Sequence, residues 1–176
     1  MNFGLIVAYY ITKNGIKKNP YECFSLVAKQ DGSVEFETWN ISDKLPQPSM
    51  EDLEALEPEA MLYYAREKKL SELNEKFNDA LENGHMTCSF GVEIDANNDA
   101  LRNVGNLLLV MGADDKEMFC DYNNQFHELT RIQVELIQKE IIGHIKGLYA
   151  KKWSYREKIN TLTTAEEVNS IVIEFK

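Results

Sequence analysis

The sequence has little cysteine and no long apolar run. Its three cysteines, Cys23, Cys88 and Cys120, are scattered and odd in number, which is typical of reduced, mostly buried thiols rather than of a disulfide framework. No stretch approaches the roughly 20 apolar residues that a membrane-spanning helix requires. The apolar segment 3–11 has no basic region before it and no small-residue cleavage site after it, so no secretory signal is expected. We therefore expect a soluble protein that is made in a cytoplasm.

Positive charge is also scarce, since 19 basic residues stand against 29 acidic ones and the formal net charge is −10. Phosphate binding requires a concentrated basic surface, so we expect no nucleic acid as a main partner. The same excess of negative charge argues against docking on an anionic membrane. The simplest interpretation is that the charge keeps the protein in solution.

The usual signatures of an enzyme are missing as well. The sequence holds no Gly-x-Ser-x-Gly elbow and no glycine-rich loop that could cradle a phosphate. A cysteine nucleophile needs a base within reach, whereas Cys23 and Cys88 lie in apolar segments that predict buried thiols. We therefore expect no catalytic residue and no cofactor.

A metal site is not expected either. Zinc ligands usually come in close pairs, and the pair formed by His85 and Cys88 has no second pair to match it. Asp95, Asn97 and Asp99 alternate as calcium ligands do, but the glycine and the distal glutamate of a calcium loop are missing. The other candidates are expected to have local roles: His85 as an exposed loop residue, His127 beside a small turn, and His144 within a helix.

The first forty residues predict strands. Residues 3–12 are rich in β-branched and aromatic side chains, and Asn14-Gly15 follows them as a hairpin signal. A second hairpin is predicted from strands 23–29 and 33–39, which flank Asp31-Gly32. In the returning strand one face is expected to be buried and the other wet, because two sets alternate: Val34, Phe36 and Thr38 against Glu35, Glu37 and Trp39.

A linker at 42–48, with two prolines, precedes a helical segment. Ser49 with Asp52 predicts an N-cap, and Pro58 predicts an interruption after a short first turn. The main helix is then expected from about 57 to 82. It carries an apolar stripe at seven-residue spacing, which is either core against the C-terminal helices or a short coiled-coil seam between copies: Leu56, Tyr63, Leu70 and Phe77.

The C-terminal half predicts mostly helix. A strand is expected at 86–94 and a helix at 99–111, closed by Gly112. Two short strands, 117–122 and 126–129, flank a turn. Thr130 with Gln133 forms a capping box that opens the longest helix, which should run to about Ile159. A short last helix should follow Thr163-Thr164, with Glu166 and Glu167 three residues after each threonine as in a capping box, and should carry Val168 and Ile171.

These elements predict an α+β fold with a small N-terminal antiparallel β-hairpin unit, a long linking helix and a C-terminal helical module that includes a short β element. The corresponding segments are 1–48, 49–84 and 85–176.

One basic cluster stands out, formed by lysines and an arginine with aromatic residues among them near the end of the long helix. It is either a patch for an acidic partner or a nucleic-acid strand, or a set of cations that stabilises the helix C-terminus. A third interpretation pairs this basic end with an acidic face of another copy. Together with the stripe residues, the candidate interaction surface includes Lys151, Lys152, Trp153 and Arg156.

The order of motifs from residue 118 onward carries a resemblance. The pattern starts with an aromatic strand at Phe119, an Asp/Asn turn at 121–124 and a Leu-Thr pair at Leu129-Thr130 that opens a helix. The helix then carries a histidine, an aromatic residue and a lysine, which are His144, Tyr149 and Lys152. The ending follows the order Ile159, Thr163-Thr164, Glu166-Glu167 and Val168. This part resembles a domain of unknown function found at the C-terminus of phage and prophage tail-fibre, tail-fibre-assembly and minor tail proteins. It departs from that pattern at Met118 and Phe119, where the family often has tryptophan.

The N-terminal part is similar to small phage tail-assembly proteins in its strand ending FETWN, its linker KLPQPS and its helix start MEDLEAL. The resemblance implies no catalytic residue. It implies a structural or tail-assembly protein that acts through protein–protein contacts, either in the virion or in the host cytoplasm. Its partners would be other tail proteins or copies of itself. If the apolar stripe is a seam between copies, a homo-oligomer would form through the 57–82 helix. The alternative is a small acidic regulator that binds a protein, such as a phage-encoded inhibitor of a host system.

Overall fold

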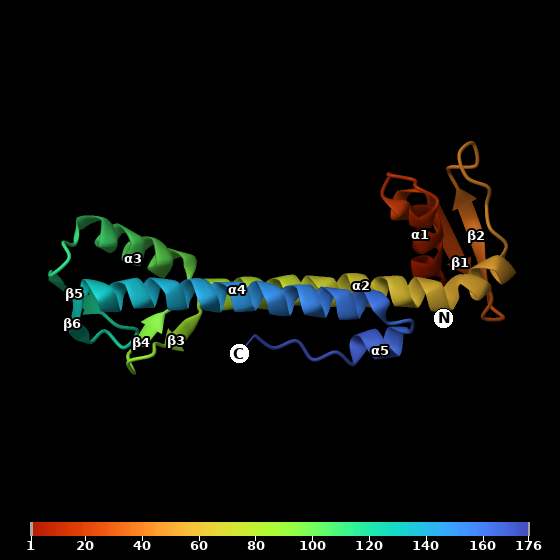
Figure 1. The fold of residues 1–176 in the computed structure, drawn as a ribbon. Coiled ribbons are helices and arrows are strands. Elements are labelled where there is room, and N and C mark those ends of the chain that lie inside the picture. The colour runs from red at the N-terminus through yellow and green to blue at the C-terminus, as the bar shows by residue number, and fades with distance from the viewer. Residues whose placement is uncertain (1, 176) are drawn as a thin grey trace. The chain divides into compact units, whose positions relative to one another are not determined.

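The computed structural model describes residues 2–175 and combines α-helices with three antiparallel strand pairs, which confirms the expected α+β class (Figure 1). The chain forms two compact units. Unit 1 holds the residues up to Lys69 together with Thr161–Ile171, and unit 2 holds Leu70–Asn160 together with the residues from Val172 on. These limits differ from the segments 1–48, 49–84 and 85–176, because helix α2 (Met50–Glu82) contributes to both units and the chain after helix α4 (Arg131–Thr161) returns to unit 1.

The strand expected at 3–12 is wrong, because this segment is helix α1 (Phe3–Lys13). The Oδ1 atom of Asn2 caps the helix by accepting a hydrogen bond from the Leu5 backbone N–H at 3.3 Å. Most of the helix is apolar and five of its residues are buried, so burial overrides the strand preference of the β-branched residues. Asn14-Gly15 ends this helix instead of forming a hairpin, and Gly15 adopts the left-handed backbone with φ of 78°.

The second expected hairpin is confirmed as β1 (Phe24–Ala28) and β2 (Val34–Trp39), which follow a 3-10 turn at Pro20–Glu22. The predicted alternation of buried and exposed residues along β2 is confirmed for residues 34–37 and is wrong for Thr38 and Trp39. A bulge shifts the register between Ser25 and Leu26, so Thr38 is exposed while Trp39 turns toward the core. There the Trp39 Nε1–H donates to the Leu45 carbonyl at 2.9 Å.

The expected cap of α2 is confirmed. The Ser49 hydroxyl and backbone N–H both donate to Asp52 Oδ2, at 2.6 and 3.2 Å, and the Asp52 N–H donates back to Ser49 Oγ at 3.1 Å. The expected interruption is wrong, because α2 continues through Pro58. Leu53 and Ala60 are fully buried on either side of this proline, while Pro58 itself is exposed, so packing on both sides holds the helix through the proline.

After α2, unit 2 contains a hairpin where a single strand was expected at 86–94. Strands β3 (His85–Thr87) and β4 (Glu93–Asp95) pair with each other, and the chain reverses between them. The Cys88 N–H donates to the Val92 carbonyl at 2.8 Å, and Gly91 takes a φ of 85° that the turn requires.

The rest of unit 2 follows the expected order. Helix α3 (Asn98–Val110) leads to the hairpin formed by β5 (Lys116–Cys120) and β6 (Phe126–Thr130), and α4 starts directly after it. In Figure 1 α3 and the β3–β4 hairpin lie on opposite sides of α4. Between them is the core of unit 2, whose buried members include Cys88, Ile94, Val104, Leu129, Val134, Ile137 and Ile141.

The cap of α4 is also confirmed. The Thr130 N–H and hydroxyl each donate to Gln133 Oε1 at 3.0 Å, and the Gln133 N–H approaches Thr130 Oγ1 at 3.4 Å. At 31 residues α4 is slightly shorter than α2, which has 33, so it is not the longest helix. The last helix, α5 (Ala165–Asn169), has the expected capping box between Thr164 and Glu167 and carries Val168. It ends before Ile171, so the prediction that Ile171 belongs to this helix is wrong.

Removing the cap of α4 should destabilise unit 2. Thr130→Ala should lower the free energy of unfolding by about 1 kcal/mol, because the first turn loses its side-chain acceptor. Thr130→Ser keeps the hydroxyl and should recover most of the loss. Urea unfolding followed by circular dichroism measures both, and equal stabilities for the alanine and serine variants would contradict a capping role.

Candidate interaction surface

The apolar stripe of α2 packs within its own chain. Leu56, Tyr63 and Leu70 are half-buried, and Phe77 is only 3% exposed. The Tyr63 ring lies 5.2 Å from that of Tyr9, within unit 1. Leu56 and Tyr63 pack against the core of unit 1. The predicted packing against the C-terminal helices is present at Phe77, which meets an aromatic ring of α4. The alternative of a seam between copies stays a prediction.

Phe77 is the most deeply buried of these four residues. Its ring centroid is 4.9 Å from that of Tyr149 and 5.7 Å from that of Phe175, and Lys152 Nζ lies 4.1 Å above the ring. Lys152 is thus held by an aromatic face and is half-buried. Of the predicted surface residues, Phe77 and Lys152 therefore serve packing within unit 2.

The remaining basic residues separate onto different sides of α4. Lys151 lines a hollow with Tyr155, Lys158 and Glu174. Trp153 is 64% exposed and its ring lies 6.0 Å from that of Tyr149. Residues three or four apart share one face of a helix, which joins Trp153 to a run that we name the basic stripe: Ile142, Lys146, Tyr149, Trp153 and Arg156.

A second surface, which the sequence analysis missed, lies between α3 and the β5–β6 hairpin. A groove of about 230 Å³ runs along β5, and we name it the hairpin groove. Its floor is apolar and its edge carries polar side chains; the lining residues are Asp95, Ala100, Asn103, Val104, Leu107, Met118, Phe119 and Cys120.

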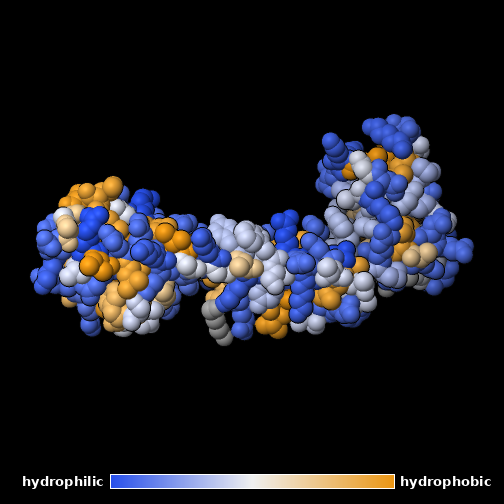
Figure 2. Space-filling model, in the orientation of Figure 1, coloured by the Kyte–Doolittle hydropathy of each residue, from blue (hydrophilic) through white to orange (hydrophobic). Residues whose placement is uncertain are grey.

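Large apolar side chains stand exposed around this groove. Met118 is 60% exposed, and Phe126, which pairs with Cys120 across the hairpin, is 70% exposed. Val110 is 76% exposed, three residues after Leu107 on the same flank of α3. Figure 2 shows hydrophobic side chains gathered over α3 and the start of α4, where Leu109 and Ile132 are also exposed.

One signal in the sequence could have revealed this surface. Residues 107–110 are four consecutive apolar residues in a helix. Such a run cannot all face one core, because a helix turns by a full circle in 3.6 residues. Some of its members must therefore point to water or to a partner.

The turn of the β5–β6 hairpin is built around a carboxylate. Asp121 is only 8% exposed. Its Oδ1 accepts hydrogen bonds from the Asn123 and Gln125 N–H groups at 2.8 Å each, and its Oδ2 lies 2.7 Å from His127 Nε2. The hydrogen bond from His127, followed by that from Gln125, holds the pKa of Asp121 below its usual range. The ionised carboxylate thus fixes the turn that presents Phe126.

This turn should make stability depend on acid pH. Because the pKa of Asp121 is lower in the folded chain than in the unfolded one, its contribution is present above the unfolded pKa of about 3.9 and is lost as pH falls through the folded value. Asp121→Asn should be less stable than wild type at pH 7 and should lose less stability on acidification. Thermal unfolding from pH 7 to pH 2 measures both.

The matched control is Asp114→Asn, at an exposed position in the loop before β5. It should follow the wild-type pH dependence. If Asp121→Asn follows it too, the hydrogen bonds of Asp121 do not control the turn.

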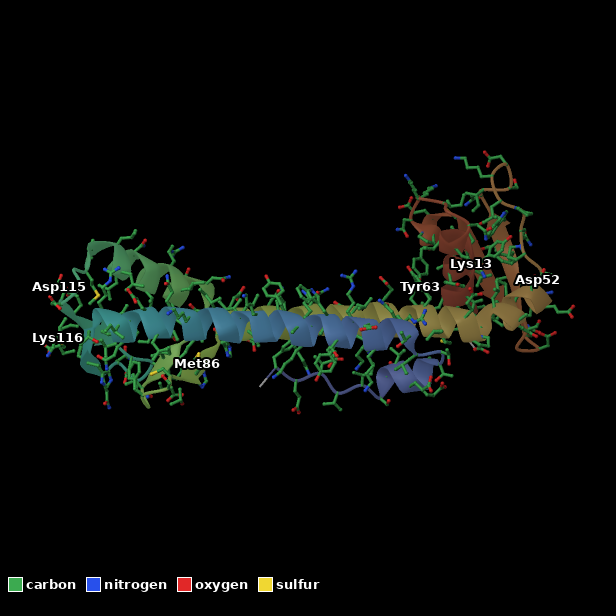
Figure 3. All side chains as sticks on the ribbon, in the orientation of Figure 1. Lys13, Asp52, Tyr63, Met86, Asp115 and Lys116 are labelled. Atoms are coloured by element: carbon green, nitrogen blue, oxygen red, sulfur yellow. The ribbon has the colours of Figure 1, made fainter. Side chains whose placement is uncertain are left out.

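The segment that carries the hairpin groove is acidic. Between Glu93 and Thr130 there are eight acidic residues and two basic ones. Asp115 and Lys116 mark the entry to β5 in Figure 3. In contrast, α4 carries seven basic residues against three acidic ones. The segment that carries the groove is therefore net acidic in sequence, while helix α4 is net basic.

The titratable groups elsewhere serve structure. In unit 1 the Glu59 carboxylate binds Lys13 Nζ at 2.6 Å and accepts from the Tyr9 hydroxyl at 2.7 Å. The hydrogen bond from Lys13, followed by that from Tyr9, lowers the pKa of Glu59. Burial first, and then Glu59, raises the pKa of Tyr9 to about 12. A carboxylate kept ionised and a phenol kept protonated stabilise α1 against α2 within this unit.

Each histidine has a definite place. His85 belongs to β3 rather than to a loop, where it stacks on Tyr122 at 4.4 Å and lies 3.3 Å from Glu93. His127 contacts the turn, as expected, through Asp121. His144 lines a hollow of α2 and α4 with His85, and burial, followed by Lys151 and His85, lowers its pKa. Across residues 2–175 no three His, Cys, Asp or Glu side chains gather as metal ligands would.

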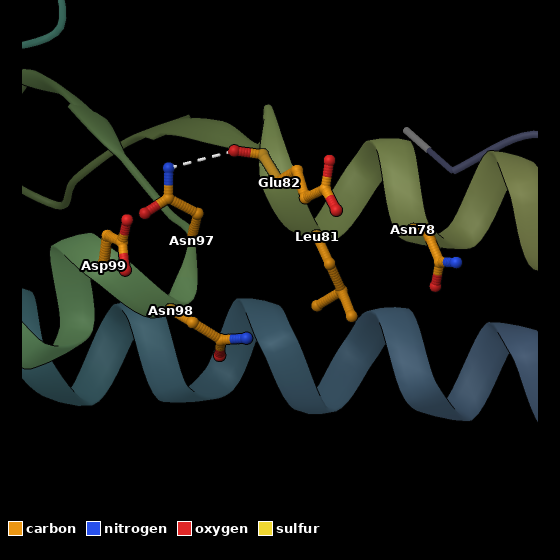
Figure 4. Close-up of a pocket in the computed structure, with 6 residues that line it drawn as sticks. All are labelled: Asn78, Leu81, Glu82, Asn97, Asn98 and Asp99. Atoms are coloured by element: carbon orange, nitrogen blue, oxygen red, sulfur yellow. Dashed lines mark hydrogen bonds between the residues drawn. The ribbon is translucent and has the colours of Figure 1, made fainter.

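The polar hollow in Figure 4 lies where α2 ends and α3 begins. Asn97 bridges the two helices: its Nδ2 donates to the Glu82 carbonyl at 3.1 Å, and its Oδ1 accepts from the Ala100 N–H at 2.8 Å. Asp99 pairs with Arg102 at 3.0 Å. These contacts close helix ends, so the Asp95–Asp99 segment has a local structural role.

The cysteines are only partly as expected. Cys23 and Cys88 are buried, while Cys120 is exposed beside the hairpin groove. Cys23 precedes β1 and Cys88 follows β3, so both lie in turns rather than in strands. All three are free thiols.

The fold is thus an α+β arrangement in which long helices carry small hairpins. Of the described helices, none is both long enough and apolar enough to cross a membrane. The chain belongs to the family described as Domain of unknown function (DUF4376), whose model matches residues 64–173. No curated protein and no solved structure matches this chain. The match includes the hairpin groove and the basic stripe.

Proposed function

We propose that this protein is a structural or assembly component of a phage or prophage tail, which acts through protein–protein contacts and without catalysis. The observation that carries the proposal is the set of exposed apolar side chains around the hairpin groove, inside the family-matched segment. Apolar groups that gather on a surface typically mark a site for another protein. Phe126 at 70% exposure and Val110 at 76% exposure would both lose contact with water when a partner covers them.

The surroundings of the groove support a binding role. Its apolar residues sit on α3 and on a paired hairpin, whose turn is held by Asp121. Such a surface binds with little loss of backbone freedom. The resemblance of the chain to tail proteins supplies the setting, in which the protein works in the host cytoplasm during assembly or in the virion itself. The partners would be other tail proteins or further copies.

The test is a deletion of the gene in the genome that encodes it. Lysates should then contain fewer complete tails by electron microscopy, and the protein should be found by mass spectrometry either in wild-type particles or in assembly intermediates. Complementation with Phe126→Glu should fail, because a carboxylate in the patch prevents burial. Tyr21→Glu is the matched control, since Tyr21 is 57% exposed but lies in unit 1.

Normal tails after deletion, together with particles and intermediates that lack the protein, would overturn the proposal. The alternative is then the acidic regulator. In that case one host protein should be captured by the wild-type chain, and charge reversals on its acidic face should release it.

A further inference from the structure

We propose that the hairpin groove of one copy binds the basic stripe of a second copy, and that the Trp153 side chain enters the groove. The inference rests on the proposed function, because it assigns a partner to the same groove. It requires two different surfaces on each copy, and so it predicts head-to-tail association rather than a symmetric pair.

The groove offers an apolar floor, and its lining includes one carboxylate, Asp95, and one amide, Asn103. Val104 is buried at its base, and Leu107, Phe119 and Met118 form its walls. Asp95 belongs to the acidic stretch between Glu93 and Thr130. A side chain that fits this groove needs an apolar body, and the element that carries it needs positive charge.

The basic stripe meets both requirements. Trp153, at 64% exposure, and Tyr149, at 41%, are aromatic side chains exposed to solvent on α4. Lys146 and Arg156 flank them one turn away on either side and are exposed. Tryptophan and arginine are the residues that most often dominate binding energy at protein interfaces, and a buried tryptophan also supplies an N–H donor. Asp95 or Asn103 at the groove can accept it.

The occupant is a second copy because one copy cannot fill its own groove. Trp153 follows Ile137 by 16 residues, which is about 24 Å along a helix axis. Ile137 belongs to the same core as Val104 under the groove. The groove and Trp153 of one copy are therefore held too far apart along α4 for that Trp153 to enter its own groove. The opposite net charge of the groove-bearing segment and of α4, within a chain of net charge −10, favours this one orientation between copies that otherwise repel.

The experiment uses the full-length purified protein alone, studied by sedimentation velocity over a range of concentrations. Wild type should form species larger than a dimer as concentration rises, and added salt should weaken them. Trp153→Ala should weaken association about thirtyfold, as the loss of a dominant interface residue does. Met118→Glu, at a 60% exposed position, should weaken it similarly by placing a carboxylate in the groove.

Mixing these two variants gives the decisive result. Trp153→Ala keeps an intact groove and Met118→Glu keeps an intact stripe, so an equal mixture should form heterodimers and nothing larger. Tyr21→Ala, which removes an exposed aromatic ring of unit 1, is the control and should associate as wild type does. Circular dichroism should show that all three variants fold.

A wild-type protein that stays monomeric at high concentration would overturn the inference, and so would a mixture that forms no heterodimer. Neither result touches the proposed function, which the deletion experiment tests separately. In the reverse case, the protein self-associates, tails are normal after deletion, and particles and intermediates lack the protein. That outcome would keep the head-to-tail contact and remove the proposed function.

Discussion

Ile141→Ala should lower the free energy of unfolding by about 2–5 kcal/mol, the range for large-to-small changes in a packed core. Ile141 is fully buried, and it shares the core of unit 2 with Ile94, Val104 and Ile137. Three elements, β4, α3 and α4, thus meet around this side chain. They cannot close a cavity without moving the helices, so the loss should lie well inside that range.

Ile142→Ala is the matched control, because the next side chain on α4 is 38% exposed. It should cost about 1 kcal/mol or less, since only part of the side chain leaves an apolar environment. Urea unfolding measures the free energy of unfolding of the two variants, and they can be compared when its dependence on urea concentration is the same for both. Similar losses at both positions would mean that the core does not lie on the expected face of α4.

Gly84→Ala should be destabilising by about 2–3 kcal/mol, because a methyl group has no room there. A Cβ atom on Gly84 would lie 2.5 Å from the Ala80 carbonyl oxygen and 3.3 Å from that of Ala96. Both are backbone atoms. The first belongs to the last turn of α2, and the Ala96 N–H donates to the Gly84 carbonyl at 2.7 Å. The end of α2 or the β3–β4 hairpin would have to move.

Gly143→Ala and Gly147→Ala are the controls, because a Cβ at either position has no neighbour within 4 Å. Both glycines lie inside α4, where alanine is the better helix former, so each change should stabilise by about 0.5–1 kcal/mol. In thermal unfolding, the midpoint temperature should fall for Gly84→Ala and rise for each of the two control variants. A stabilising Gly84→Ala would mean that α2 ends differently.

The starts of α2, α4 and α5 could be predicted from the sequence because their capping contacts are local. Ser49 with Asp52, Thr130 with Gln133 and Thr164 with Glu167 each connect residues three apart, and all three caps are present. The β1–β2 and β5–β6 hairpins were predictable for the same reason, since their turns contain Asp, Asn and Gly residues that favour tight reversals.

The errors concern apolar segments whose surroundings are distant in sequence. Residues 3–12 have strand-forming composition, yet α1 forms because Tyr9 and its neighbours pack on α2 some fifty residues later. Pro58 does not interrupt α2, because Leu53 and Ala60 are anchored in the core of unit 1. A periodic pattern cannot express such long-range contacts.

The candidate site divides in the same way. Trp153 and Arg156 were predicted from composition and are exposed on one stripe, while Phe77 and Lys152 pack against each other inside the chain. The hairpin groove was not predicted, because it joins α3 to β5, and no local rule places these elements side by side.

By itself the sequence determined the caps of α2, α4 and α5, the turns of the β1–β2 and β5–β6 hairpins and the distribution of charge along the chain, because these depend on residues a few positions apart. Only the tertiary structure decided which apolar residues meet the core and which meet water. Ile141 and Ile142 are adjacent and chemically identical, yet one is fully buried and the other is 38% exposed. The reason is physical: burial depends on what other elements pack against a face, and that is a property of the whole fold.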